Sequence, residues 1–208
     1  MNETALQIIG HPRFINDEER FTKTFEWYVG EAMVRYFSGF SFAFGVHIKY
    51  VRHNQNDRPA GDYDALVVMR NLELLYFECK TGGFKRYKIL NAIQNAISLN
   101  CDFLVMAAAS LDPQRLANTV AEMQHPLLAE HIRFDLAKIQ IKNTSTTIYE
   151  WHNCYFISAS DDFIEQMQAV LRFNEAKRVA RHYFMGPSDT EISMMGYQVE
   201  RIKPEVTP

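Results

Sequence analysis

Apolar residues recur along the chain at two spacings, one typical of helices and the other of strands. From Phe21 to Phe37 they return every three or four residues, which marks the buried face of a helix. The acidic run Asp17-Glu18-Glu19 just before it suits the N-terminus of that helix. Shorter runs rich in β-branched and aromatic residues indicate strands. We therefore expect helices at 21–37, 85–99, 112–124 and 161–183, and strands at 40–51, 62–69, 72–79, 101–109, 138–142 and 146–157.

The breaks between these segments indicate how they connect. Arg70-Asn71 separates two short strands, so an antiparallel hairpin is the simplest connection between them. The nearly continuous apolar run at 101–109 is typical of a central strand that is covered on both faces. The order α-β-β-β-α-β, followed by further strands and helices, predicts an α/β fold in which helices flank a mixed central sheet.

A chain of 208 residues can bury one good core, so we expect a single domain over residues 1–185. Residues 186–208 turn polar and richer in proline, which predicts a tail or an arm on a partner. No stretch approaches the ~18 consecutive apolar residues of a membrane span, and the N-terminus has no signal-peptide pattern. The three cysteines are odd in number and widely spaced, which favours reduced thiols over a disulfide framework. We expect a soluble, cytoplasmic protein.

The hairpin carries a group of charged residues. Side chains alternate between the faces of a strand, so Glu78 and Lys80 project to one side of their strand and Cys79 projects into the apolar layer on the other. The antiparallel pairing brings Asp64 close to Glu78 and Lys80. Asp62 shares the face of Asp64 by the same period of two. Three carboxylates and one lysine can therefore converge at the end of a strand pair.

Two carboxylates this close repel one another unless one is protonated or a cation lies between them. Mg²⁺ takes hard oxygen ligands and is usually bound by one or two carboxylates together with water and substrate phosphate, so Asp64 and Glu78 suit it, or Mn²⁺. Beside the metal, Lys80 would orient the attacking water or counter phosphate charge. The reaction that this set indicates is phosphodiester hydrolysis. Out of context, a Glu-x-Lys pair on a strand is more often a solvated ion pair, and this reading stays open.

The residues of the hairpin and the order of elements resemble the PD-(D/E)XK nuclease superfamily, whose fold is the restriction-endonuclease-like core. The closer resemblance is to the nuclease domain that accompanies cyclic-oligonucleotide-sensing CARF domains in CRISPR-associated effectors, and it covers residues 20–110. Tyr63 stands where the superfamily motif has proline. The matching residues are Asp64-Ala65-Leu66 and Leu75-Tyr76-Phe77-Glu78-Cys79-Lys80-Thr81.

The resemblance adds two site residues. A glutamate on the first helix often completes the metal shell in such nucleases, and Glu26 matches its Glu-x-x-Val pattern. Glu31 points roughly 140° away from Glu26 on that helix, so we expect only Glu26 to face the site. Gln94 matches a glutamine near the active site of the RecB-like branch. The resemblance also implies a role in antiviral defence. We expect the chain to be either a stand-alone nuclease, with any sensor on a separate partner protein, or a fragment of a larger protein.

A nucleic-acid substrate would need a local basic patch, because the net charge of −3 gives the chain no overall basic character. Lys85, Arg86 and Lys88 follow the proposed site and could hold phosphates. Phe84 and Tyr87 could stack on bases or pack in the core. The sequence thus predicts a Mg²⁺- or Mn²⁺-dependent nuclease acting on DNA or RNA, for which a homodimer would suit cutting of two strands. The alternatives are a nucleic-acid-binding or protein-interaction module of the same fold without turnover, and a surface charge cluster with no site.

Overall fold

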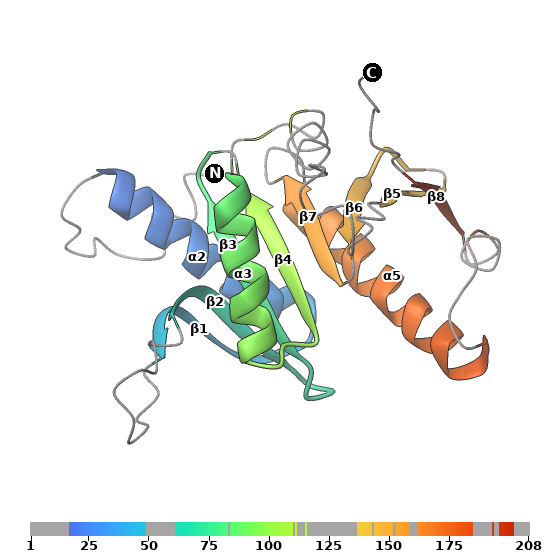
Figure 1. Ribbon diagram of the computed structural model, residues 1–208, viewed down its shortest axis with the longest axis horizontal. Coiled ribbons are helices and arrows are strands. Elements are labelled where there is room, and N and C mark those ends of the chain that lie inside the picture. Colours follow the sequence, from blue (N-terminus) through green and yellow to red (C-terminus); the bar gives the residue numbers. More distant parts are fainter. Residues whose placement is uncertain are drawn as a thin grey trace.

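The protein is α/β, with one mixed sheet and helices on both of its faces (Figure 1). In the part of the chain that the structure describes, the sheet has eight strands and is covered by three helices. The computed structural model describes residues 17–48, 61–82, 84–109, 111, 115, 137–142, 144–151, 153–158, 162–184, 193 and 196–201.

The strands lie in the order β1-β2-β3-β4-β7-β6-β5-β8 across the sheet. The helices are α2 (Asp17–Tyr36), α3 (Arg86–Ser98) and α5 (Phe163–Phe184). The strands are β1 (Gly39–Ile48), β2 (Gly61–Met69), β3 (Leu74–Lys80), β4 (Phe103–Ala108), β5 (Ala137–Ile141), β6 (Thr147–Trp151), β7 (Cys154–Ser158) and β8 (Tyr197–Arg201).

The centre of the sheet is parallel and its two sides are antiparallel. β1, β2 and β3 form an antiparallel meander, and β4 then pairs parallel with both β3 and β7. A parallel connection needs a crossover, which α3 supplies between β3 and β4. Every residue of β4 is buried, as expected for an apolar run covered on both faces. The register places Glu78 beside Met106 and Lys80 beside Ala108, at the C-terminal ends of the two strands.

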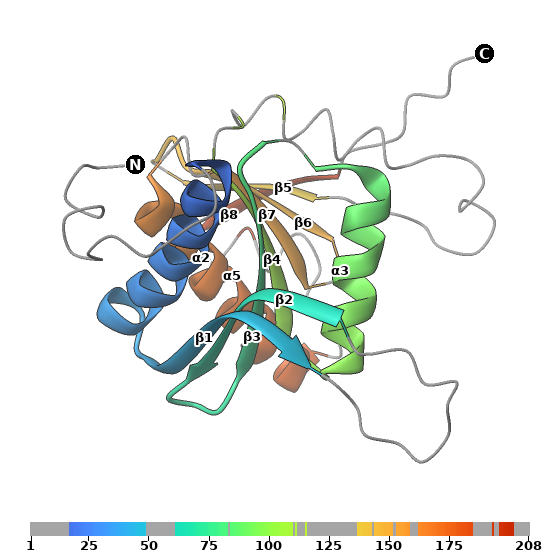
Figure 2. The ribbon, with the colours of Figure 1, turned by 90° about the vertical axis from the view of Figure 1, so that its left-hand side faces the viewer.

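The sheet divides the core into two layers. α2 and α5 lie on one face and α3 on the other (Figure 2). The rings of Tyr28, on α2, and Phe163, on α5, pack against each other at a centroid distance of 5.6 Å. Successive residues of β4 contribute to alternate layers, Val105 to the side of α2 and α5 and Met106 to the side of α3. The same alternation decides which side chains of β3 reach solvent at its end.

The element order predicted for the first half of the chain is confirmed. The structure has helix, three strands, helix and strand in that sequence, and the hairpin of β2 and β3 is antiparallel. α2 begins at Asp17, at the predicted acidic run. The long helix predicted at 161–183 is α5. Apart from residue 115, which is helical, the helix predicted at 112–124 lies outside the described residues, and so does most of the loop before β2.

One predicted strand, at 146–157, is two. β6 and β7 pair antiparallel, with Trp151 opposite Cys154. Between them Asn153 adopts a φ of +64°, a left-handed conformation that asparagine tolerates better than most residues. Its backbone N–H donates to the Glu150 carboxylate at 2.9 Å, which helps to close the turn. The apolar composition on both sides of this short turn concealed it.

Residues 197–201, expected in the polar tail, form an edge strand of the sheet. β8 pairs antiparallel with β5 along its whole length, from Tyr197 opposite Ile141 to Arg201 opposite Ala137. Tyr197 is buried in the core, with its ring 5.3 Å from that of Phe173. The alternation of Tyr197 and Val199 with polar residues is a period-two signal too short to stand out in a polar segment. Within the described residues, no helix is long and apolar enough to cross a membrane.

The burial of Tyr197 predicts that β8 stabilises the fold. Tyr197→Ala should lower the free energy of unfolding by about 3 kcal/mol, because it removes a buried ring and leaves a cavity beside Phe173. Gln198→Ala, an exposed position of the same strand, is the matched control and should change it by less than about 0.5 kcal/mol. Urea denaturation measures the free energy of unfolding of both variants. Equal stability of the two variants would show that β8 does not contribute to the core.

Candidate active site

Asp64, Glu78 and Lys80 meet at the C-terminal end of β3. The Lys80 ammonium lies 3.1 Å from Asp64 Oδ2 and forms an ion pair with Glu78 Oε1. It also donates to the Cys79 carbonyl at 3.1 Å. Cys79 itself is buried in the core layer of α2, as predicted from strand alternation. Two carboxylates therefore share one ammonium group at the end of the hairpin.

Asp64 lies where the regular alternation of β2 breaks. Ala65 is buried on the side of α2, whereas Tyr63 is buried on the side of α3, although residues two apart in a strand normally share a face. In β1, Gly45 is the residue that the register on either side places opposite Asp64, and it has a φ of +58°. Glycine adopts this left-handed conformation at little cost. The backbone is therefore twisted at Asp64 on both strands.

The twist brings the Asp64 side chain to the neighbouring strand. Asp64 Oδ2 accepts the backbone N–H of Cys79 at 2.7 Å, so a carboxylate takes the part that a backbone carbonyl has elsewhere in the ladder. The regular pairs of β2 and β3 run from Val68 opposite Leu74 to Ala65 opposite Phe77, and this contact follows them. It fixes Asp64 beside Lys80 and at the edge of the core.

Glu78 is held on both of its oxygens. Glu78 is 8 % exposed. The Tyr76 hydroxyl donates to its Oε2 atom, and Lys80 contacts its Oε1 atom. Burial raises the pKa of Glu78, and the negative charge of Asp64 raises it further against the opposing effects of Lys80 and Tyr76. Burial alone would lower the pKa of Lys80, but Asp64 and Glu78 raise it, and the net shift is upward. Two carboxylates that share one ammonium group carry an excess of negative charge, so they can bind another cation.

Glu26 lies on α2 behind the hairpin. It is 1 % exposed, and its two oxygens are 3.1 and 2.8 Å from Lys23 Nζ. Burial raises the pKa of Glu26, the hydrogen bond from Lys23 lowers it, and the charge of Asp64 raises it. A β-carbon at Gly45 would lie 3.1 Å from Lys23 Nζ and 3.7 Å from Glu26 Oε2, so the same glycine that faces Asp64 makes room for this pair. Glu31 pairs instead with Arg35, on α2.

Two other candidates, Asp62 and Gln94, are exposed. Asp62 is exposed, and its carbonyl accepts the Asn95 side-chain amide at 3.5 Å. Gln94 is exposed on α3, because it points roughly 160° away from Ala92 and Ala96, which face the sheet. The neighbouring side chain of Asn95, on α3, hydrogen-bonds with the hairpin.

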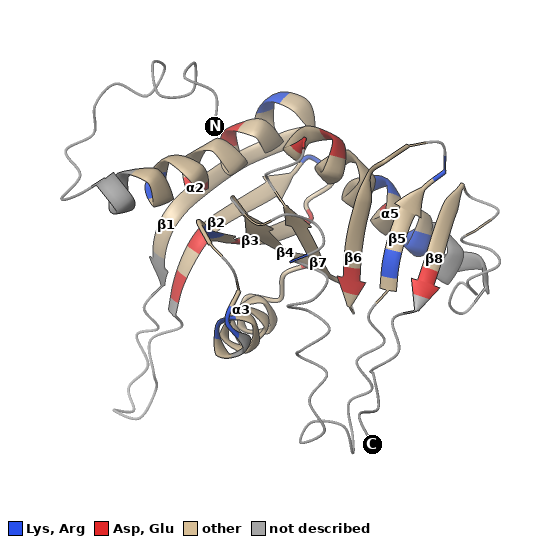
Figure 3. Ribbon diagram, turned by 90° about the horizontal axis from the view of Figure 1, so that it is seen from above, with Lys and Arg blue, Asp and Glu red and all other residues tan. Residues whose placement is uncertain are grey.

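The basic residues expected to hold phosphates lie at the start of α3, where Figure 3 shows basic colouring. Lys85 and Lys88 are exposed, and Lys88 Nζ lies 5.6 Å from the centre of the Tyr87 ring. The side chain of Arg86 is not among those that the structure describes. The two aromatic residues have different roles: Phe84 is 5 % exposed and packs edge-on against Phe156, whereas Tyr87 is 54 % exposed. Of the two, only Tyr87 is accessible to a base.

Asp64 and Glu78 fit a divalent cation in number and chemistry, since Mg²⁺ is usually bound by one or two carboxylates with water and phosphate. The shared ammonium of Lys80 shows that both carboxylates reach one cationic centre. Among the described residues, no group of three or more His, Cys, Asp or Glu side chains is arranged to hold a metal ion. Glu26 therefore does not join the pair as it stands, because Lys23 holds its carboxylate.

Four site residues were missed in the sequence. Two of them carry a weak signal: Tyr76 stands two positions before Glu78, on the same strand face, and Lys23 stands three before Glu26, on the same helix face. An isolated glycine inside a strand, such as Gly45, indicates a bulge or a close approach of backbone. Asn95 has no comparable signal, because its role depends on the packing of α3 against β2 and β3.

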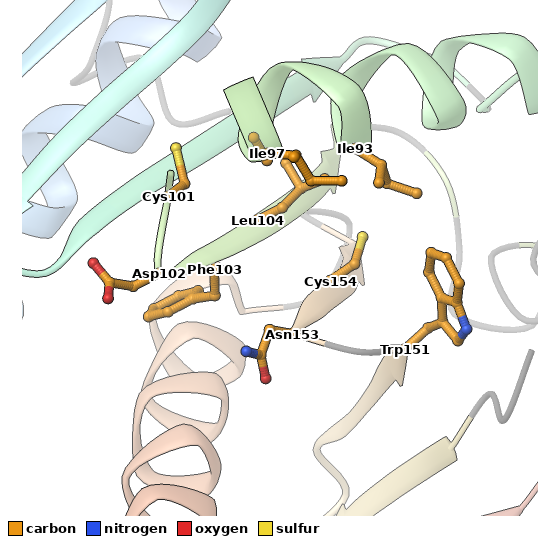
Figure 4. A pocket seen from close by; sticks show the side chains of 10 residues that line it. Ile93, Ile97, Cys101, Asp102, Phe103, Leu104, Trp151, Asn153 and Cys154 are labelled. Atoms are coloured by element: carbon orange, nitrogen blue, oxygen red, sulfur yellow. The ribbon is translucent and has the colours of Figure 1, made fainter. Parts of the chain in front are cut away.

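A separate cavity of about 310 Å³ opens beside the other end of α3 (Figure 4). It lies at the start of β4, whereas Glu78 and Lys80 are beside the end of that strand, so it is not part of the charged group. Its lining includes Ile93, Ile97, Phe103, Leu104, Trp151 and Cys154.

Comparisons of the chain with protein-family models, with curated proteins and with solved structures find no match.

The left-handed conformation of Gly45 predicts a cost for any side chain there. Gly45→Ala should lower the free energy of unfolding by about 1 kcal/mol or more, because alanine is strained at this φ. Gly82→Ala is the matched control, since a β-carbon at Gly82 meets nothing within 4 Å. Chemical denaturation of both variants measures the difference. A Gly45 variant as stable as the Gly82 variant would contradict the twist at Asp64.

The raised pKa of Glu26 predicts a pH-dependent gain for Glu26→Gln. Below the unfolded-state pKa of glutamate the carboxyl is protonated in both states, and the wild type loses stability as the pH rises from there through the raised folded-state pKa. Glutamine does not titrate. The melting temperature of Glu26→Gln relative to wild type should therefore be higher at pH 7.5 than at pH 4.5, in EDTA. A difference between Glu26→Gln and the wild type that stays constant between the two pH values would contradict the burial cost.

Proposed function

We propose that this protein is a metal-dependent nuclease that hydrolyses phosphodiester bonds in DNA or RNA. The observation that carries the proposal is the contact of Lys80 Nζ with the carboxylates of both Asp64 and Glu78 at the end of β3. A restriction-endonuclease-like core belongs to the same proposal, and the order α2-β1-β2-β3-α3-β4 supports it. A cytoplasmic setting is also part of it, and the free thiols of Cys79, Cys101 and Cys154 are compatible with that.

The roles follow from the contacts. Asp64 and Glu78 would hold Mg²⁺ or Mn²⁺, which when bound neutralises charge on the phosphodiester and lowers the pKa of a bound water. Lys80 lies between the carboxylates and would orient the attacking water or stabilise the charge that develops on the phosphate oxygens. Glu26 would serve as the auxiliary ligand only after its carboxylate leaves Lys23.

The start of α3 gives the substrate a basic approach to this site. Lys85 and Lys88 are exposed close in sequence after Lys80, and both can neutralise phosphate charge without reading sequence. Arg86 belongs to the same proposal by its place in the chain. Because these contacts are with the backbone of the nucleic acid, binding should weaken as the salt concentration rises.

A nuclease assay tests the proposal directly. Single- and double-stranded DNA and RNA are incubated with the protein in Mg²⁺, in Mn²⁺ and in EDTA. We expect cleavage of at least one substrate with metal and none in EDTA. Lys80→Ala should lower the rate by about 100-fold or more, because it removes the group that orients water or stabilises charge.

Lys138→Ala is the matched control, since Lys138 forms an exposed ion pair with Glu200 on the far side of the sheet. Its rate should equal that of the wild type. Cleavage that survives EDTA, or that Lys80→Ala leaves unchanged, would overturn the mechanism. Binding of nucleic acid without cleavage in every metal would favour an interaction module of the same fold.

A further inference from the structure

Tyr76 is a buried residue of β3 that lies between the hairpin and α3. It is fully buried, and its ring meets that of Tyr63 from β2 edge-on at a centroid distance of 5.2 Å. Strand alternation places its side chain on the same face as that of Glu78, two residues later. Packing thus holds the ring in one orientation, with its hydroxyl directed along the strand toward the charged group.

The Tyr76 hydroxyl connects this packing to Glu78. It donates to Oε2 of the carboxylate, while Lys80 contacts the other oxygen, Oε1. The side-chain amide of Asn95 also hydrogen-bonds with the hydroxyl, and it donates to the Asp62 carbonyl at 3.5 Å. The hydroxyl is therefore fixed by β3, by the ring of Tyr63 and by a side chain of α3.

We propose that Tyr76 is a positioning residue: its hydrogen bond to Oε2 fixes the carboxylate of Glu78 so that Oε1 faces the cation shared with Asp64. This rests on the proposed function, because it takes Glu78 as a metal ligand. Tyr76 itself does not touch the cation. Its part resembles that of the outer hydrogen-bond partners that orient the ligands of metal sites in general.

A tyrosine suits this role for two reasons. A glutamate side chain rotates about three bonds, and a ligand that is already oriented loses less conformational freedom when it binds a cation. The packed ring also leaves the hydroxyl little freedom, so its hydrogen bond holds Oε2 of Glu78 in one place. A phenylalanine at the same place would keep the packed ring and lose only the donor.

Metal binding, measured without turnover, tests this role. Mn²⁺ is titrated into the full chain and its dissociation constant is determined by electron paramagnetic resonance for the wild type and for Tyr76→Phe. We expect Tyr76→Phe to bind Mn²⁺ about 10-fold more weakly, the lower end of the range for the loss of an outer hydrogen-bond partner. The rate of cleavage at subsaturating Mn²⁺ should fall by a similar factor and recover in part when Mn²⁺ saturates.

Tyr155→Phe is the matched control. Tyr155 is also fully buried, and its hydroxyl donates to Asn174 Oδ1 at 3.2 Å, away from Glu78. It should lose stability in the same way as Tyr76→Phe but bind Mn²⁺ as the wild type does. Melting curves recorded for each variant ensure that affinities are compared at temperatures where the protein is folded.

The outcomes separate the two claims. If the wild type binds Mn²⁺ and Tyr76→Phe binds it equally well, the positioning role is overturned and the proposed function stands. If the wild type binds no Mn²⁺, both are overturned. Should Tyr76→Phe fail to fold, Asn95→Ala tests the same contact from α3: we expect weaker Mn²⁺ binding with a smaller factor, and unchanged binding would overturn the role.

Discussion

The hydrogen bond from the Cys79 backbone to the Asp64 carboxylate is the contact on which the candidate site depends. At 2.7 Å, it continues the pairing of β2 and β3 with a side chain in place of a main-chain carbonyl. Across the sheet, Gly45 lies opposite Asp64 in a left-handed conformation. The antiparallel pairing of β2 and β3 brings Asp64 close to Glu78 and Lys80. The bond to Cys79 then fixes the Asp64 carboxylate on β3, beside Lys80.

The charges at this end of the sheet are balanced in an uneven way. Glu26 forms an ion pair with Lys23, whereas Asp64 and Glu78 share Lys80. Burial then makes the imbalance costly, because it raises the pKa of both Glu26 and Glu78 and so disfavours their charged forms. Clusters whose titration is displaced by burial and by like charge are frequent at functional sites, and this one lies at the end of the parallel strands.

Much of this arrangement could be predicted from the sequence, because it depends on local periodicity. The spacing of apolar residues gave the order of elements as far as β4, and the period of two placed Cys79 in the core and Glu78 and Lys80 outside it. Contacts made by packing could not be predicted. The choice of Asn95 over Gln94 depends on how α3 is rotated against the sheet. The strand β8 was missed since Tyr197 pairs with a strand more than fifty residues away, in a segment whose composition is polar.

The most direct measurement is anomalous diffraction at the manganese edge, from crystals of the wild-type protein soaked in Mn²⁺. It locates the ion without reference to activity. We expect one anomalous peak within coordination distance of the carboxylates of Asp64 and Glu78, with Lys80 Nζ moved away from at least one of them. A peak elsewhere on the protein, or no peak at this pair while Lys80 still joins both carboxylates, would rule out the proposed metal site.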